Sequence, residues 1–198
     1  MTSTPPITQS DMAHRLPPAR LVDRAAHLVE AVRGRRAVHV GFVDSGCWDY
    51  HDRFDSWLHA HLDRAAAALV GLDLDEAGVA RARELGFAAH AVDCSDPDAV
   101  ARLGLEPAEV VVAGEVIEHL DASGPFLDGL HALVRPGGRL VVTTPNASGG
   151  GPNWESPTAR CWVTCAMKSG SNTVSMPRRT SMLYMWMRSG IGTRACST

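Results

Sequence analysis

The chain has 198 residues, of which 45% are hydrophobic, and it carries a formal net charge of −3 with a pI near 6.3. This length and composition favour one globular domain and exclude a fibrous or wholly disordered chain. The weak negative charge gives nucleic acid no electrostatic attraction, so a small molecule is the expected partner. The five cysteines are odd in number and scattered, which argues against a disulfide framework.

The first eighteen residues contain no continuous apolar stretch, and no run of about 18 apolar residues occurs anywhere in the chain. We therefore expect a cytoplasmic protein with no membrane partner. The oligomeric state is not readable from the sequence.

Residues 1–18 predict a flexible N-terminus, and apolar residues at helical spacing then predict an amphipathic helix over 19–32. Five short runs have the composition of buried parallel strands: 37–43, 68–74, 87–93, 109–115 and 139–145. Helical patterns fill the gaps between them at 54–67, 75–85, 96–103 and 124–134.

This alternation predicts an α/β fold, namely a Rossmann-like, doubly wound and mostly parallel sheet over residues 19–147. Ligands of such sheets bind at the carboxyl ends of the strands. We expect the sheet to be incomplete at its C-terminal hairpin, because no convincing pair of strands follows Asn146.

The composition changes abruptly at residues 148–198. Six basic residues and one acidic residue give residues 149–198 a formal charge of +5, which leaves −8 for the rest because the whole chain carries −3. Two explanations are open: a basic flexible tail, or a reading-frame change in the coding DNA. We favour the second, because periodicity and charge pairing disappear together. Both predict disorder or poor packing there, although the run 182–187 has β-like composition.

An acidic residue, Asp73, stands at the end of the second predicted strand, and Glu115 stands at the end of the fourth. A carboxylate in the first of these positions can accept hydrogen bonds from both hydroxyls of a ribose. The pattern indicates a ligand that contains a nucleoside.

Several motifs occur together in a fixed order: VGFVDSG at 40–46, GLD at 71–73, AVDC at 91–94, VVAGEVIEHL at 111–120 and RPGGRL at 135–140. In this order they resemble the class I S-adenosylmethionine-dependent methyltransferases, in the broad group that includes the ubiquinone-biosynthesis methyltransferases. The resemblance covers about residues 35–146. It implies S-adenosylmethionine as cofactor and methyl transfer to a small-molecule acceptor.

The resemblance implies a cofactor contact at Gly41 and Gly46, where backbone without a Cβ lets the ligand approach closely. The usual Gly-x-Gly-x-Gly of the family is absent, and an ordinary strand-ending turn is the alternative. The connection 47–53 is expected to shape or cover the cofactor mouth.

By the same resemblance, Asp73 binds the ribose with Leu74 beside it, and Asp75 caps the next helix. Asp93 and the backbone of Cys94 match the place where the family holds the adenine amino group. For Asp93, a solvated turn residue is the alternative reading.

Glu115 is expected to line the cofactor pocket, while Glu118 and His119 begin the helix that faces the acceptor. His119 is the candidate catalytic residue, because an imidazole can receive a proton from an acceptor hydroxyl or amine. A helix-start residue bonded to backbone is the alternative. Methyl transfer asks for little beyond in-line positioning, so no obligatory catalytic side chain is expected.

We expect no metal site, because His59 and His61 are two positions apart and would point to nearly opposite sides of a helix. A nicotinamide-dependent oxidoreductase is a competing reading. Its acidic residue lies about 20 positions after its glycine fingerprint, whereas Gly41 and Asp73 are 32 positions apart and the fingerprint is missing. A truncated or frameshifted remnant that binds cofactor without catalysis is the third hypothesis.

Overall fold

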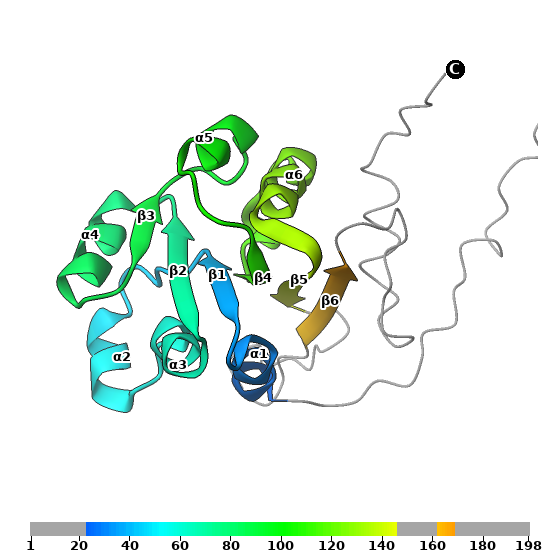
Figure 1. Ribbon diagram of the computed structural model, residues 1–198. Helices are drawn as coiled ribbons and strands as arrows, with labels where there is room; N and C mark the ends of the chain where they lie inside the picture. The colour runs from blue at the N-terminus through cyan, green and yellow to red at the C-terminus, as the bar shows by residue number, and fades with distance from the viewer. Residues whose placement is uncertain (1–22, 146–161, 169–198) are drawn as a thin grey trace, which may run out of the picture.

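The computed structural model describes residues 23–145 and 162–168, which form a sheet with helices on both faces (Figure 1). The strands lie in the order β3-β2-β1-β4-β5-β6. Their bounds are β1 Arg36–Val40, β2 Ala68–Asp73, β3 Ala89–Ala91, β4 Ala108–Gly114, β5 Val134–Pro145 and β6 Trp162–Lys168. The first five pair in parallel, and β6 runs antiparallel to β5. This order is the one known for the Rossmann fold and confirms the predicted fold class.

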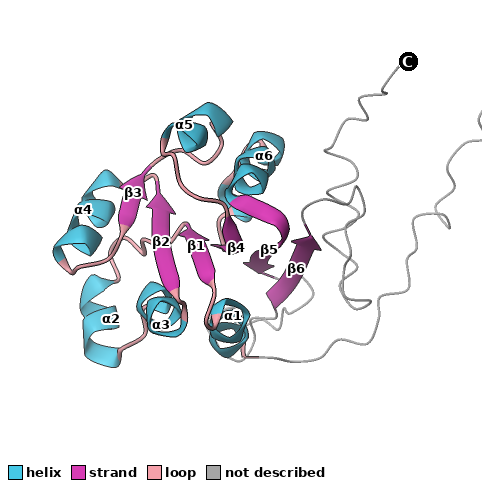
Figure 2. Cartoon of the chain, in the orientation of Figure 1, coloured by secondary structure: helices cyan, strands magenta, loops and turns pink. Residues whose placement is uncertain are grey.

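The helices alternate with the strands (Figure 2). Their bounds are α1 Arg24–Val32, α2 Trp48–Phe54, α3 Leu58–Ala65, α4 Glu76–Glu84, α5 Pro97–Arg102, the short 3₁₀ helix η2 Ile117–His119, and α6 Ser123–Leu133. The α1, α3 and α4 helices pack on one face of the sheet, and α5 and α6 pack on the other (Figure 1).

Residues of β4 alternate between these two helical layers, which explains the continuous apolar run of this strand. Val110 and Val112 pack against α1 and α3, while Val111 and Ala113 pack against α5 and α6. Both faces are buried, as expected for a central parallel strand.

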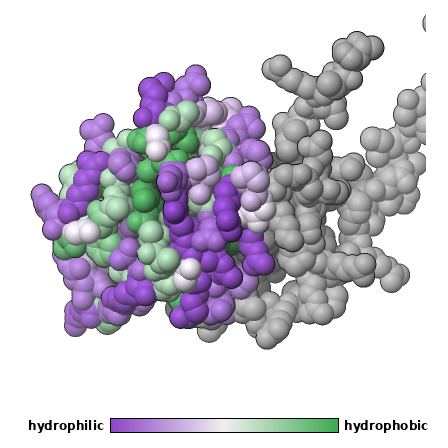
Figure 3. All heavy atoms as spheres, in the orientation of Figure 1, coloured by the Kyte–Doolittle hydropathy of each residue, from purple (hydrophilic) through white to green (hydrophobic). Residues whose placement is uncertain are grey.

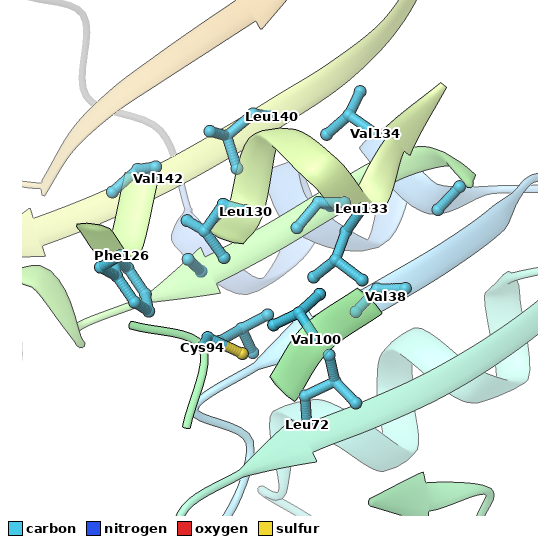
Figure 4. Packing of buried hydrophobic residues seen from close by; sticks show 14 of the residues in the cluster. Val38, Leu72, Cys94, Val100, Phe126, Leu130, Leu133, Val134, Leu140 and Val142 are labelled. Atoms are coloured by element: carbon cyan, nitrogen blue, oxygen red, sulfur yellow. The ribbon is translucent and has the colours of Figure 1, made fainter. Parts of the chain in front are cut away.

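The larger core cluster lies under α5 and α6, where Phe126, Leu130 and Leu133 of α6 meet β4 and β5 (Figure 4). Burial of each such side chain contributes about 1.5–3 kcal/mol. Cys94, in the loop after β3, belongs to the same cluster, so this core reaches the carboxyl ends of the strands.

Aspartates mark the starts of three helices. Asp23, Asp75 and Asp96 cap α1, α4 and α5, and each side chain accepts a backbone N–H of the first turn. The capping role predicted for Asp75 is therefore confirmed.

The helix predicted over 54–67 is shorter in the structure, where α3 begins only at Leu58. The connection 47–53 is mostly helical, as α2, and a separate α3 follows it. Asp55 ends α2 in a left-handed conformation with φ +46°, and its N–H donates to the His51 carbonyl. Asp tolerates the left-handed region better than most residues. The break therefore depends on the conformation of one residue, which leaves no trace in the apolar periodicity.

One strand within the compositionally different segment 148–198 contributes to the sheet. The β6 strand pairs with β5 from Pro145 opposite Trp162 to Arg139 opposite Lys168. The sequence predicts no strand pair there, because the composition of the segment gives no signal for the pairing of β6 with β5. The β-like run 182–187 lies outside the described residues.

In the part of the chain that the structure describes, no helix has the length and apolar character needed to cross a membrane.

Candidate functional site

A crevice opens at the carboxyl ends of β1, β2 and β3, between β1 and the segment after β4. The strand order reverses between β1 and β4, which is where sheets of this kind bind ligands. The pocket encloses about 70 Å³ and is lined by Val40, Gly41, Leu72, Asp73, Leu74, Val92, Asp93, Cys94, Ser95, Val116, Leu120 and Phe126. Five of the predicted cofactor residues therefore lie together in this lining: Gly41, Asp73, Leu74, Asp93 and Cys94.

Asp73 ends β2, and backbone hydrogen bonds orient its carboxylate. Oδ2 accepts the Val43 N–H at 2.8 Å, and Oδ1 accepts the Asp75 N–H at 3.0 Å. A carboxylate offers about four accepting positions, so each oxygen keeps one for a ligand. The two bonds tie the loop after β1 to the loop after β2.

A second link between these loops lies beside the first. The Ser45 hydroxyl donates to Asp75 Oδ2, and Asp75 Oδ1 accepts the Gly78 N–H at 3.0 Å. The Ser45 hydrogen bond, followed by the Gly78 one, lowers the pKa of Asp75. The N-cap of α4 therefore also holds the loop that follows β1.

The loop after β3 brings Asp93 and Cys94 to the pocket. Asp93 Oδ1 accepts the Ser95 N–H at 2.7 Å, which forms a tight local turn. Cys94 is 4% exposed, and burial, with smaller effects of Asp93 and Asp73, raises the pKa of its thiol to about 12. Gly129 of α6 lies so close that a Cβ there would be 2.0 Å from the Cys94 carbonyl oxygen. The helix thus supports this loop from behind.

The two predicted glycines lie in different places. Gly41 lines the pocket with φ +69°, and Val116 covers it so closely that a Cβ on residue 41 would lie 2.0 Å from Val116 Cγ2. Gly46 has φ +87°, with open space where a Cβ would lie, and is not part of the lining.

Leu74, beside Asp73, is 65% exposed although it is apolar and lines the pocket. Figure 3 shows hydrophobic residues reaching the surface within a mostly hydrophilic face. An aliphatic side chain in water at a pocket mouth gains free energy when a flat apolar ligand covers it.

Glu115 lies at the end of β4 but outside the pocket lining. Its Oε1 forms an ion pair with Arg24, 2.9 Å from Nε, and the same Nε–H donates to the hydroxyl of the buried Thr143 with an Nε–Oγ1 distance of 3.2 Å. Glu115 has φ +60°, an unusual conformation for a residue with a side chain.

His119 ends η2 with its side chain exposed, and its N–H donates to the Val116 carbonyl. It is not part of the pocket lining, so the structure separates it from the five grouped residues.

Sequence reasoning missed the apolar walls of the pocket. Val116 and Leu120 come from the segment around η2, and Phe126 comes from α6. In the sequence, Val116 is recognisable only as a neighbour of Glu115, and Phe126 only as one of the apolar residues at helical spacing in its helix. Nothing in their spacing distinguishes a pocket wall from ordinary core.

His59 and His61 do face different directions on α3, as predicted. His59 is 1% exposed, whereas His61 is partly exposed and its ring lies 2.7 Å from the Asp55 carbonyl oxygen. Among the described residues, no group of three or more His, Cys, Asp or Glu side chains is arranged to hold a metal ion.

The family model for the methyltransferase domain matches residues 11–190. The chain belongs to this family. The match confirms the resemblance to class I S-adenosylmethionine-dependent methyltransferases, and S-adenosylmethionine is the cofactor of that class.

Curated relatives of this methyltransferase domain include ubiquinone biosynthesis O-methyltransferases. That of Nitrobacter winogradskyi is 28% identical over 159 residues, covering 72% of this chain and 53% of the relative. That of Bradyrhizobium sp. is 32% identical over 101 residues, covering 47% of this chain and 35% of the relative. The chain therefore spans about half, or less, of the length of these relatives.

Similar solved structures include an S-adenosylmethionine-dependent methyltransferase from Mesorhizobium loti, with 22% identity, a TM-score of 0.43, and coverage of 62% of this chain and 52% of that one. Another is the N-methyltransferase NodS from Bradyrhizobium japonicum in complex with S-adenosyl-L-homocysteine, with 15% identity, a TM-score of 0.47, and coverage of 63% and 62%.

Proposed function

We propose that the chain binds S-adenosylmethionine at the carboxyl ends of β1 to β3 and transfers its methyl group to a small-molecule acceptor. The observation that carries the proposal is the position of Asp73, which lines the pocket with one accepting site left on each carboxylate oxygen. Two neighbouring ribose hydroxyls match this pair of sites.

The other lining residues suit the rest of a nucleoside. Leu74 offers an exposed apolar surface for a base, and Val92 and Phe126 add apolar walls. The Asp93 carboxylate and the backbone at Cys94 are polar groups for an exocyclic amine. Glu115 contributes to the proposed cofactor site through the backbone turn that it forms, because its side chain pairs with Arg24.

The pocket volume of about 70 Å³ limits how much of the ligand the pocket can hold. Pockets for drug-sized ligands begin at about 300 Å³, so the ligand would extend past Leu74 into the open crevice.

When bound, S-adenosylmethionine supplies a methyl group on a cationic sulfur, which is a good leaving group. The chain then has two tasks: to hold the acceptor atom in line with the methyl group and to keep competing water away. We infer a hydroxyl acceptor, because the curated relatives named above are O-methyltransferases. His119, exposed next to the pocket wall residue Leu120, is our candidate to take the hydroxyl proton as the carbon–oxygen bond forms.

Calorimetric titration with S-adenosylhomocysteine and with NAD tests the cofactor. We expect binding of the sulfur nucleoside and none of NAD; the reverse result would refute the proposal. Release of S-adenosylhomocysteine with a panel of phenols and amines then tests the acceptor class. Binding without turnover on any acceptor would favour the cofactor-binding remnant.

The role of His119 is tested separately with His119→Asn. We expect a lower kcat for a hydroxyl acceptor, with S-adenosylhomocysteine affinity unchanged. An unchanged kcat and pH profile would remove His119 from the mechanism.

A further inference from the structure

Arg24 lies across the carboxyl ends of β4 and β5, although it belongs to α1, about ninety residues earlier in the chain. Its guanidinium contacts Glu115 after β4 and Thr143 in β5. The Arg24 and Glu115 side chains are only 22% and 28% exposed. Charged pairs shielded to this degree are expensive to break, because the remaining partner is left poorly solvated.

The Arg24 guanidinium also packs against the backbone of β4. A Cβ on Gly114, the last residue of β4, would lie 2.6 Å from Nη2 of Arg24. Burial lowers the pKa of Arg24, while Glu115 and then Glu118 raise it. The neighbouring carboxylates therefore offset part of the cost of placing this charge against the backbone, and the pKa stays below its usual value.

The Arg24–Glu115 ion pair stabilises an unfavourable backbone conformation of Glu115. Glu115 has φ +60°, and such conformations cost about 1–3 kcal/mol unless their surroundings hold them. Among the described residues, the Glu115 N–H donates to the Thr143 carbonyl at 2.8 Å, and the side chain pairs with Arg24. Backbone and side chain of the turn are thus both anchored to neighbouring elements.

The next residue, Val116, leads from this turn to the pocket. It lines the cavity and covers Gly41, and its backbone precedes η2. A shift of the turn at Glu115 therefore moves a pocket wall.

We propose that Arg24 is a positioning residue of the cofactor site: its ion pair with Glu115 holds the turn that sets Val116 over Gly41. This inference rests on the proposed function, because it assigns the pocket to S-adenosylmethionine. Arg24 acts through Glu115 and has no contact with the ligand in this scheme.

Arg24→Gln tests the proposal in the full chain, with S-adenosylhomocysteine and adenosine as probes in calorimetry or ligand-observed NMR. We expect about tenfold weaker binding of S-adenosylhomocysteine, on the scale of one displaced contact. Adenosine affinity should stay the same, because adenosine needs only the Asp73 and Asp93 side of the pocket. Equal weakening of both ligands would indicate general destabilisation and would overturn the proposal.

Arg64→Gln is the matched control. Arg64 pairs at 2.7 Å with Asp55, the other described non-glycine residue with positive φ, and this pair is exposed and lies outside the pocket lining. We expect its loss to leave affinity for both ligands unchanged. If Arg64→Gln weakened S-adenosylhomocysteine as much as Arg24→Gln, the specific role of Arg24 would be rejected.

Glu115→Gln, on the other side of the ion pair, keeps the test valid if Arg24→Gln folds poorly. Glu115→Gln should weaken the binding of S-adenosylhomocysteine to a similar extent. The double variant should bind no more weakly than either single variant, because all three lose the same ion pair. Arg24→Lys, which keeps the charge, should recover part of the affinity. Fully additive effects would contradict the proposal. If the wild-type chain binds no S-adenosylhomocysteine, the proposed function fails; if it binds and Arg24→Gln binds equally well, only the role of Arg24 fails.

Discussion

The Nδ1 atoms of His39 and His59 lie 3.2 Å apart, inside the layer between β1 and α3. Both side chains are buried, and their rings stack at 5.4 Å. One nitrogen must donate and the other accept, so at least the accepting ring is neutral, and both rings cannot be protonated together. A proton added to His59 would place a charge among Phe42, Trp57 and Phe87.

This pair predicts loss of stability in mild acid. Burial lowers the pKa of His59 from 6.5 to about 4, and burial, His59 and Arg24 lower that of His39. The unfolded chain therefore binds more protons than the folded chain between these values, and stability falls as pH drops from 6.5 toward 4. For His59 alone, we expect the free energy of unfolding to be about 2 kcal/mol lower at pH 5 than at pH 8.

Urea unfolding at a series of pH values measures this effect. His59→Phe should flatten the dependence, whereas His61→Gln, on the same helix but partly exposed, should keep the wild-type slope. A His59→Phe variant with an unchanged slope would show that the acid sensitivity comes from other groups.

Gly41→Ala should destabilise the chain, because the new Cβ would lie 2.0 Å from Val116 Cγ2 at a backbone φ of +69°. We expect a loss of about 1–3 kcal/mol from overpacking. Adding Val116→Ala should recover the part of the stability loss that comes from the steric clash. The part that comes from the strained backbone, about 1 kcal/mol, should remain. Thermal unfolding of both single variants and the double variant checks the coupling, and purely additive losses would contradict the close approach.

Asp73→Asn should weaken S-adenosylhomocysteine binding by about 1–3 kcal/mol, the scale of a lost charged hydrogen bond. Asp96→Ala is the control: it removes the α5 cap, which costs about 1 kcal/mol of stability, but Asp96 lies outside the pocket lining. Calorimetric affinities and melting temperatures together separate the two roles. Unchanged affinity in Asp73→Asn would refute the ribose assignment.

Deletion of residues 147–198 should lower the melting temperature and promote aggregation, because it removes β6 and exposes the edge of β5. Deletion of 169–198 leaves every described element in place and should have the smaller effect. Equal melting temperatures for the two deletions would mean that β6 adds no stability. Resequencing the DNA beyond the codon for Asn146 tests the reading-frame hypothesis directly; an alternative frame without strand-like runs would count against it.

Local sequence was sufficient for most of the fold. Apolar runs located the parallel strands, and the aspartate that caps α4 was recognisable by type and position. Asp73, Asp93 and Cys94 were predictable as neighbours in space, because carboxyl ends of parallel strands meet at one edge of a sheet. The break at Asp55 and the pairing of β6 were not predictable, because each depends on backbone contacts that leave no periodic signal.

The sequence by itself determined the doubly wound sheet and the edge at which its acidic residues gather, since both follow from periodicity and chain order. Only the tertiary structure decided that Glu115 pairs with Arg24, that Val116 covers Gly41 and that His39 meets His59. These contacts join elements far apart in the chain, and their formation depends on how side chains pack between layers. No spacing along the sequence encodes that packing.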